Sequence, residues 1–244
     1  MSKITAIVCA YNEEKTIEGV LNGLLNCQKL DEIIAVNDGS TDNTGIILKN
    51  FLTKNSSKKI KIIEFKENKG KGFAMAEAIK NSENEVLLFI DADLINLREE
   101  HISQLINPLF EKRAKMVIGK IIENNSIFKN KIDILKPLSG QRALFKEDIL
   151  PLIEKMKETH FGVETLINLY YRISKMKVIY VDLENLGHLI KFQKFSPQKA
   201  TKEYILAGKD IFKTTIKDFP SYYLKSHNIN TGFEKFKNYF IKKS

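Results

Sequence analysis

Short apolar segments alternate with amphipathic ones over the first 122 residues. The apolar segments predict strands at 4–11, 32–38, 59–65, 85–91 and 114–122. Segments with apolar residues at helical spacing predict helices at 13–26, 41–52, 70–81 and 97–112. Such an alternation predicts a mostly parallel sheet that is covered by helices on both faces. We expect Ser40 or Thr41 to cap the second helix, and Pro108 to kink the fourth.

The pattern is less regular after residue 122. Helices are predicted at 147–157 and 163–174, and a strand at 177–183. Beyond residue 190, apolar residues at helical spacing lie among lysines and predict an amphipathic helical tail. Neither an internal repeat nor a low-complexity linker divides the chain, so its length of 244 residues fits one α/β domain with a C-terminal extension.

Composition predicts a cytoplasmic protein that does not span a membrane. No run of about 18 apolar residues occurs, and the apolar stretch at the N-terminus is too short for a secretory signal. Cys9 and Cys27 form no CxxC pattern, so we expect small buried thiols in a reducing compartment.

Nearly all of the net charge of +9 lies in the last 56 residues, which carry twelve Lys and four Asp or Glu. A basic tail fits an anionic partner, either a lipid surface, a phosphorylated acceptor or a nucleic acid, and it also fits a merely solvated helix rich in lysine. Its aromatic residues follow helical spacing rather than the pattern of a stacking platform, which argues against nucleic acid. Peripheral membrane contact through residues 198–244 stays open.

Polar residues gather where three predicted strands end. They are Tyr11-Asn12-Glu13, Asn37-Asp38-Gly39-Ser40 and Asp91-Ala92-Asp93. Because ligands bind at the carboxyl ends of parallel strands, these residues predict a polar cleft. Two carboxylates on one turn suit a hard divalent cation that also bridges phosphate oxygens, although a helix-capping turn is the alternative. A P-loop is absent, and so is a glycine-rich turn after the first strand.

Four linked motifs carry a family resemblance. "ITAIVCAYNEEKTI", "DEIIAVNDGSTDNT", "NKGKGFAMAEAI" and "VLLFIDADL" occur in this order over residues 3–97. Together they resemble the family 2 type of nucleotide-sugar glycosyltransferase, which implies a GT-A fold: Rossmann-like, with a mixed, mainly parallel sheet flanked by helices. The resemblance implies donor binding by Ala10, Tyr11, Asn12, Glu13, Asp38, Lys69, Gly70, Asp91 and Ala92. It also implies that Asp91 and Asp93 form a DxD motif that binds Mg²⁺ or Mn²⁺, with Asp93 the stronger ligand.

The second half resembles glucosyl-3-phosphoglycerate synthases. The segments that carry this similarity are "LSGQRALFK", "FGVETLI" and "LGHLIK". The resemblance implies that Ser139, Gly140 and Arg142 line the sugar and acceptor region, that Glu164 lies by the sugar, and that His188 completes the metal site. Glu164 would be a general base in an inverting reaction and would position the donor in a retaining one. The acidic pair usual in inverting members is reduced here to "VET", so both outcomes stay open.

The expected function is metal-dependent transfer of a hexose from a nucleoside-diphosphate sugar, with UDP-glucose as the expected donor, to a small phosphorylated acceptor such as 3-phosphoglycerate. The alternatives are the same chemistry on a lipid acceptor, either a polyprenyl phosphate or a diacylglycerol type, and an inactive nucleotide-sugar-binding protein. Residues 1–122 would bind the donor, residues 123–190 would bind the acceptor and complete the metal site, and residues 191–244 would be the tail. A homodimer is compatible with this reading. Asp93, Glu164 and Arg142 are the expected catalytic residues.

Overall fold

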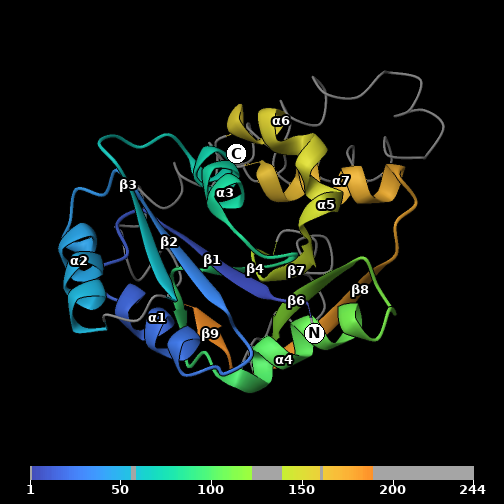
Figure 1. The fold of residues 1–244 in the computed structure, drawn as a ribbon, viewed down its shortest axis with the longest axis horizontal. Helices are drawn as coiled ribbons and strands as arrows, with labels where there is room; N and C mark the ends of the chain where they lie inside the picture. The colour runs from blue at the N-terminus through green and yellow to red at the C-terminus, as the bar shows by residue number, and fades with distance from the viewer. Residues whose placement is uncertain (1, 56–58, 123–138, 160–161, 189–244) are drawn as a thin grey trace, which may run out of the picture.

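A seven-stranded sheet forms the centre of the protein (Figure 1). The computed structural model describes residues 2–55, 59–122, 139–159 and 162–188. The strand order is β3-β2-β1-β4-β7-β6-β8. The strands are β1 (Ile4–Ala10), β2 (Glu32–Asp38), β3 (Ile60–Phe65), β4 (Val86–Asp91), β6 (Met116–Ile122), β7 (Arg142–Phe145) and β8 (Val178–Glu184). All of these strands run parallel except β7, which confirms the predicted mixed, mainly parallel sheet.

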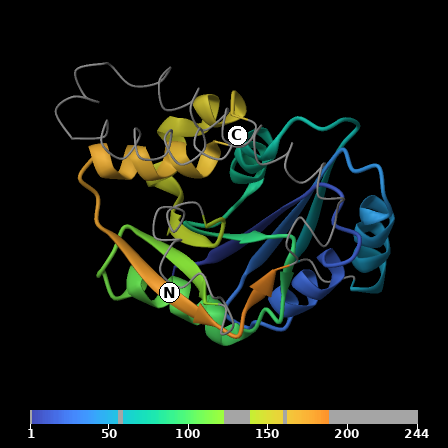
Figure 2. The same ribbon diagram turned by 180° about the vertical axis from the view of Figure 1, so that it is seen from behind.

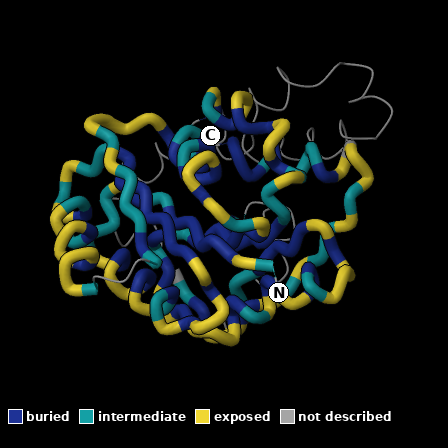
Figure 3. The backbone as a smooth tube through the Cα atoms, in the orientation of Figure 1, coloured by how far each residue is buried: buried dark blue, intermediate teal, exposed yellow. Residues whose placement is uncertain are grey.

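Helices cover both faces of the sheet (Figures 1 and 2). One face packs against α1 (Ile17–Leu25), α2 (Thr44–Lys54) and α4 (Glu99–Phe110). The other packs against α3 (Lys71–Asn81), α5 (Lys146–Ile149), α6 (Ile153–Lys157) and α7 (Val163–Ile173). Side chains of β4 alternate between the two cores, because successive residues of a strand point to opposite faces. The central strands β1, β2 and β4 are therefore almost wholly buried, as the dark blue tube in Figure 3 shows.

β7 was not predicted. This four-residue strand lies between β4 and β6 and runs antiparallel to both, with Arg142 opposite Phe89 and Ile118. A short segment that begins with arginine has no apolar alternation by which the sequence would reveal a strand. Because β7 is reversed, it begins at the edge where the parallel strands end. The residues just before it, Gly140 and Gln141, therefore lie beside the end of β4.

Two local predictions were wrong. The helix predicted at 147–157 is interrupted by a 3₁₀ turn at Leu150–Leu152, where Pro151 has no N–H to donate. α2 begins at Thr44, and the carboxylate of Asp42 accepts the Thr44 N–H at 2.9 Å. The predicted caps Ser40 and Thr41 instead bond to the neighbouring loop.

The fourth predicted helix is α4, which contains Pro108 and ends at Phe110. The kink at Pro108 stays a prediction.

A small second sheet joins distant segments. β5 (Leu94–Ile95) pairs antiparallel with β9 (Gly187–His188), with Leu94 opposite His188. Residues 123–138 and 189–244 lie outside the described residues, so the helical tail and its membrane contact stay predictions.

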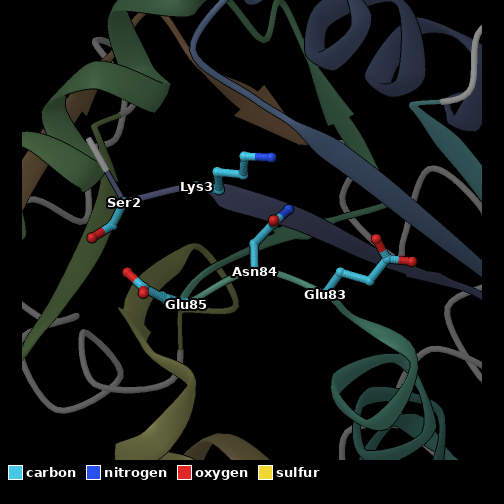
Figure 4. A pocket seen from close by; sticks show the side chains of 5 residues that line it. All are labelled: Ser2, Lys3, Glu83, Asn84 and Glu85. Carbon is cyan, nitrogen blue, oxygen red and sulfur yellow. The ribbon is translucent and has the colours of Figure 1, made fainter.

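A polar network closes the opposite edge of the sheet, where the strands begin. Glu32 is buried, and its carboxylate accepts hydrogen bonds from the Thr5 hydroxyl at 2.6 Å and the Glu83 N–H at 3.0 Å. Lys61 forms an ion pair with Glu32 at 2.7 Å. Asn84 donates to the Thr5 hydroxyl and lines an open pocket at this edge with Ser2, Lys3, Glu83 and Glu85 (Figure 4). Glu32 thus bonds to β1, to β3 and to the turn before β4, which is typical of a structural element.

Glu32→Gln is expected to destabilise the fold by about 1–2 kcal/mol at pH 7, because a buried acceptor loses its charge-assisted bonds. Burial opposes ionisation, but the bonds from Lys61, Thr5 and Glu83 hold the pKa of Glu32 below its ordinary value. Stability from a lowered pKa is present above the unfolded value and is lost as pH falls through the folded one. Urea unfolding at pH 7 and pH 3 should therefore show a difference that disappears in acid. Glu85→Gln, an exposed change at the same edge, should have no effect at either pH.

Candidate active site

Two loops after neighbouring strands are joined by hydrogen bonds. Asn12, in the left-handed conformation with φ 58°, donates its N–H to the Ser40 hydroxyl at 3.0 Å. Its side-chain oxygen accepts the Thr41 N–H at 2.8 Å. The Glu13 N–H donates to the Thr44 hydroxyl at 2.8 Å. The loops after β1 and β2 therefore form one polar rim at the carboxyl edge of the sheet.

The aromatic ring of Tyr11 lies on this rim. Ala10, the last residue of β1, is buried, whereas Tyr11 is 46% exposed. A half-exposed ring at the end of a central strand offers a flat apolar surface beside the polar groups of the rim.

Asp38 shapes the turn before α3. Its buried carboxylate accepts the backbone N–H groups of Lys69 at 2.8 Å and Gly70 at 3.0 Å, and the side-chain amide of Asn68 at 3.1 Å. Gly39, with φ 67°, lies so close to Glu67 that a Cβ would overlap its backbone. The hydrogen bonds of Asp38 and the close approach at Gly39 therefore hold the end of β2 against the "NKG" turn.

The side chain of Lys69 lies at the surface. It is 42% exposed, faces Glu67 at 3.8 Å and lies 5.3 Å from the ring centre of Phe73. Within this turn, Lys69 reaches Asp38 through its backbone.

A partly buried cation, Lys71, lies between two carboxylates at the centre of the site. Lys71, the first residue of α3, is 2.6 Å from Asp91 Oδ1 and 2.6 Å from Glu164 Oε1. Gln141 donates its side-chain N–H to Asp91 Oδ2 at 2.7 Å. The first turns of α3 and α7, the end of β4 and the turn before β7 thus converge on one cluster.

The electrostatics of the cluster favour the charged forms of Asp91 and Lys71. Burial alone would raise the pKa of Asp91, but the Lys71 ammonium and the bonds from Lys71 and Gln141 lower it below the ordinary value. Burial alone would lower the pKa of Lys71, but Asp91 and Glu164 raise it. Lys71 and Asp91 therefore each stabilise the charged form of the other.

Gly140 allows the turn before β7 to approach Asp91. A Cβ at this position would lie 2.1 Å from Asp91 Oδ1, closer than any real contact. Only glycine fits at this distance, which explains the "SGQ" segment in structural terms.

Arg142 faces protein groups. Its side chain is 0% exposed, and it donates to the carbonyls of Ser139 and Glu164 and to the side-chain oxygen of Asn168. Ser139, Gly140 and Glu164 are thus brought to one edge of the sheet, where Arg142 contacts the backbone of Ser139 and Glu164; their role in acceptor binding stays a prediction.

Asp93 and the backbone of His188 lie close together. Ala92 is buried and Asp93 is partly exposed, directly before β5. The pairing of Leu94 with His188 brings the chain of His188 beside Asp93. Among the described residues, no group of three His, Cys, Asp or Glu side chains is poised to hold a metal ion. Asp91 and Asp93 nevertheless supply the carboxylate oxygens that a hard divalent cation takes.

Cys9 lies under the site, opposite Asp91 and Val36 in the sheet. Burial raises its pKa to about 12, although Lys71 opposes this shift. The pKa of Cys27 is also raised, chiefly by burial. Since the thiolate is the nucleophile, alkylation of Cys9 by iodoacetamide at pH 8 should be at least about 100-fold slower in the folded protein than in urea. Peptide mass spectrometry checks this, and rapid labelling of folded Cys9 would contradict the assignment.

Sequence reasoning missed Lys71 and Gln141. The motif "NKGKG" contains two lysines, and the resemblance pointed to Lys69. The available signal was position, because a residue at the start of a helix that follows the site edge points toward that edge. Gln141 gave no signal of its own.

Comparisons with known proteins agree with this geometry. The model of the family described as "Glycosyl transferase family 2" matches residues 5–187. A UDP-N-acetylglucosamine--dolichyl-phosphate N-acetylglucosaminyltransferase of Methanococcus voltae is 34% identical over 140 residues, covering 52% of this chain and 55% of its own. A poly-beta-1,6-N-acetyl-D-glucosamine synthase of Staphylococcus aureus is 26% identical, covering 73% of this chain and 41% of its own. This chain therefore spans about half the length of these curated relatives or less.

A solved structure shares the fold. Glucosyl-3-phosphoglycerate synthase of Mycobacterium tuberculosis, determined with Mn²⁺, UDP and phosphoglyceric acid, superposes with a TM-score of 0.67 at 22% identity. The match covers 88% of this chain and 78% of that one. In the described part of this protein, the helices are too short or too polar to cross a bilayer.

Proposed function

Because the chain belongs to glycosyl transferase family 2, we propose that it transfers a hexose from a nucleoside-diphosphate sugar, UDP-glucose in the first instance, to a small phosphorylated acceptor such as 3-phosphoglycerate. The observation that carries the proposal is the partly buried cluster of Lys71, Asp91 and Glu164 at the carboxyl edge of the sheet. In α/β sheets this edge is where ligands bind.

The donor would bind across the rim formed by the first two loops. Tyr11 offers its ring to the base, while the loop residues Asn12 and Glu13 present polar groups beside it. Asp38 and Gly70 define the turn next to the rim. In this proposal residues 1–122 form the donor half, and residues 123–190 contribute Ser139, Gly140 and Glu164 on the acceptor side.

A divalent cation would be held chiefly by Asp93, with His188 and Asp91 nearby. Asp93 is a partly exposed carboxylate directly before β5, where the pairing with β9 brings the backbone of His188 beside it. When bound, Mg²⁺ or Mn²⁺ supplies Lewis-acid neutralisation of the leaving diphosphate. The solved Mycobacterium tuberculosis enzyme was determined with Mn²⁺ and UDP, which supports this choice of group.

Glu164 would act on the sugar side of the cluster. Its carboxylate is held at 2.6 Å by Lys71, which fixes its direction. In an inverting reaction it accepts the proton of the acceptor hydroxyl, and in a retaining reaction it orients the donor sugar. In either case the ammonium of Lys71 lies between the carboxylates of Asp91 and Glu164 and offsets their mutual repulsion.

A lipid phosphate is the second candidate acceptor. The Methanococcus voltae relative is named for transfer to dolichyl phosphate, and the last 56 residues of this chain carry most of its net positive charge. A polybasic segment binds anionic membrane surfaces, where such a lipid would be presented. The phosphorylated head is common to both candidates.

Acceptor choice is tested by release of UDP or GDP from UDP-glucose, UDP-N-acetylglucosamine and GDP-mannose with Mn²⁺. Each donor is paired with 3-phosphoglycerate, glycerol 3-phosphate or polyprenyl phosphate in vesicles. The proposal expects the fastest turnover with UDP-glucose and a soluble phosphate. Turnover with the vesicles alone would support the lipid acceptor. No metal-dependent release from any donor would overturn both.

A further inference from the structure

Arg142 is a fully buried charge beside the proposed active site. It is the first residue of β7, in register with Phe89 and Ile118, and its side chain is 0% exposed. A guanidinium has five N–H donors in a rigid plane. Within the described chain, these donors reach only neutral oxygens, and Nε has no partner.

The partners of Arg142 belong to two different walls of the site. One is the carbonyl of Ser139, in the turn that places Gly140 and Gln141 against Asp91. The other two lie on α7: Asn168 Oδ1 at 3.2 Å and the carbonyl of Glu164 at 3.4 Å. A single rigid group therefore connects the turn that contacts Asp91 to the helix turn that carries Glu164.

The energetic cost of this arrangement points to a role beyond packing. Removing a charge from water without a directly paired carboxylate is unfavourable, and an apolar residue of similar volume would often be no worse for stability. Burial lowers the pKa of Arg142 below its ordinary value, although the nearby charges of Glu164 and Asp91 oppose this shift. Because the buried guanidinium of Arg142 is costly for stability, we explain it by its position between the turn before β7 and the first turns of α7.

We propose that Arg142 is a positioning residue, which sets the distance between the Asp91 side and the Glu164 side of the site and does not bind the acceptor. This inference rests on the proposed function for its kinetic consequence, because the two carboxylates act on one substrate there. It differs from the role that the family resemblance implies for Arg142, which is to line the acceptor region. The buried side chain and its protein partners distinguish the two.

The kinetic experiment compares wild type with Arg142→Met and Arg142→Lys, using UDP-glucose, Mn²⁺ and 3-phosphoglycerate. Because small displacements of reacting groups cost up to about 100-fold in rate, Arg142→Met should lower kcat by about 10- to 100-fold. The KM values for donor and acceptor should stay within about 3-fold, and Arg142→Lys should recover part of kcat. A rise of more than about 10-fold in acceptor KM with kcat retained, or no kinetic change, would overturn the proposal.

An activity-independent measurement separates this proposal from the proposed function. Hydrogen exchange of Arg142→Met should increase in 139–145 and in 163–168 together, and stay unchanged in β2 and β3. Arg172→Met changes an exposed arginine on α7, and it should alter the exchange of neither segment. If the wild-type protein transfers no sugar, the proposed function fails, but hydrogen exchange still decides whether Arg142 joins the two segments. If exchange is unchanged, or increases in only one of the segments, the positioning role of Arg142 is rejected. Arg142→Lys serves the same comparison if Arg142→Met does not fold.

Discussion

Replacing Asp93 by alanine is expected to lower sugar transfer at least about 1000-fold and to remove its dependence on Mn²⁺. Asp93 lies directly before β5, beside the backbone of His188, and is the carboxylate proposed to hold the cation. Loss of Asp93 would therefore remove the main oxygen ligand of the cation. Steady-state rates across a Mn²⁺ titration measure the loss of transfer. Calorimetry of UDP binding with and without Mn²⁺ measures the loss of metal dependence.

Glu18→Ala is the matched control for this change. Glu18 is an exposed acid on α1, and its removal takes away one negative charge without touching the site. Its rate and metal dependence should equal those of wild type. An Asp93→Ala variant that still binds UDP more tightly with Mn²⁺ would show that the metal site lies elsewhere.

The second large effect is expected for Lys71→Met. This change leaves the carboxylates of Asp91 and Glu164 facing each other with no cation between them. Removing one partner from a largely buried ionic cluster should cost about 2–4 kcal/mol of folding stability. Transfer should fall by about 100-fold or more, because the displaced carboxylates no longer hold their positions. Urea unfolding and steady-state kinetics give the two values.

Lys80→Met separates this effect from a general loss of lysine. Lys80 lies on the same helix, α3, where it pairs with Glu154 at the surface. An exposed pair of this kind contributes little, so both stability and transfer should be unchanged. Equal behaviour of the Lys71 and Lys80 variants would contradict the central role of the cluster.

Six of the seven strands of the large sheet could be predicted from the sequence, but β7, which lies between β4 and β6, could not. β1, β2, β3, β4, β6 and β8 are apolar runs within a residue or two of their predicted bounds. β7 was missed because its stability comes from neighbours that are far apart in the chain: Phe89 on one side and Ile118 on the other. The Pro151 break was missed for the opposite reason, since the apolar spacing of 147–157 outweighed a local backbone constraint.

The proposed site was predictable as a set of strand ends but not as a cluster of contacts. The loops after β1, β2 and β4 follow from the rule that parallel strands end at one edge. The pairing of Lys71 with Glu164 joins residues 93 positions apart and depends on how α3 and α7 pack. The buried position of Arg142 likewise follows from β7. Interactions that depend on helix packing leave no local pattern.

The hydrogen bonds between the loops after β1 and β2 determine how a nucleotide would associate with the rim. Because Asn12 and Glu13 are already bonded to Ser40, Thr41 and Thr44, the entropy of ordering these loops is lost during folding and not on binding. Calorimetry of UDP at several temperatures should then give a small negative heat-capacity change, near that expected from the apolar surface of the nucleotide and Tyr11 alone. Association should accordingly be close to rigid-body docking on this side of the molecule, with the donor's base meeting a surface that exists before it arrives.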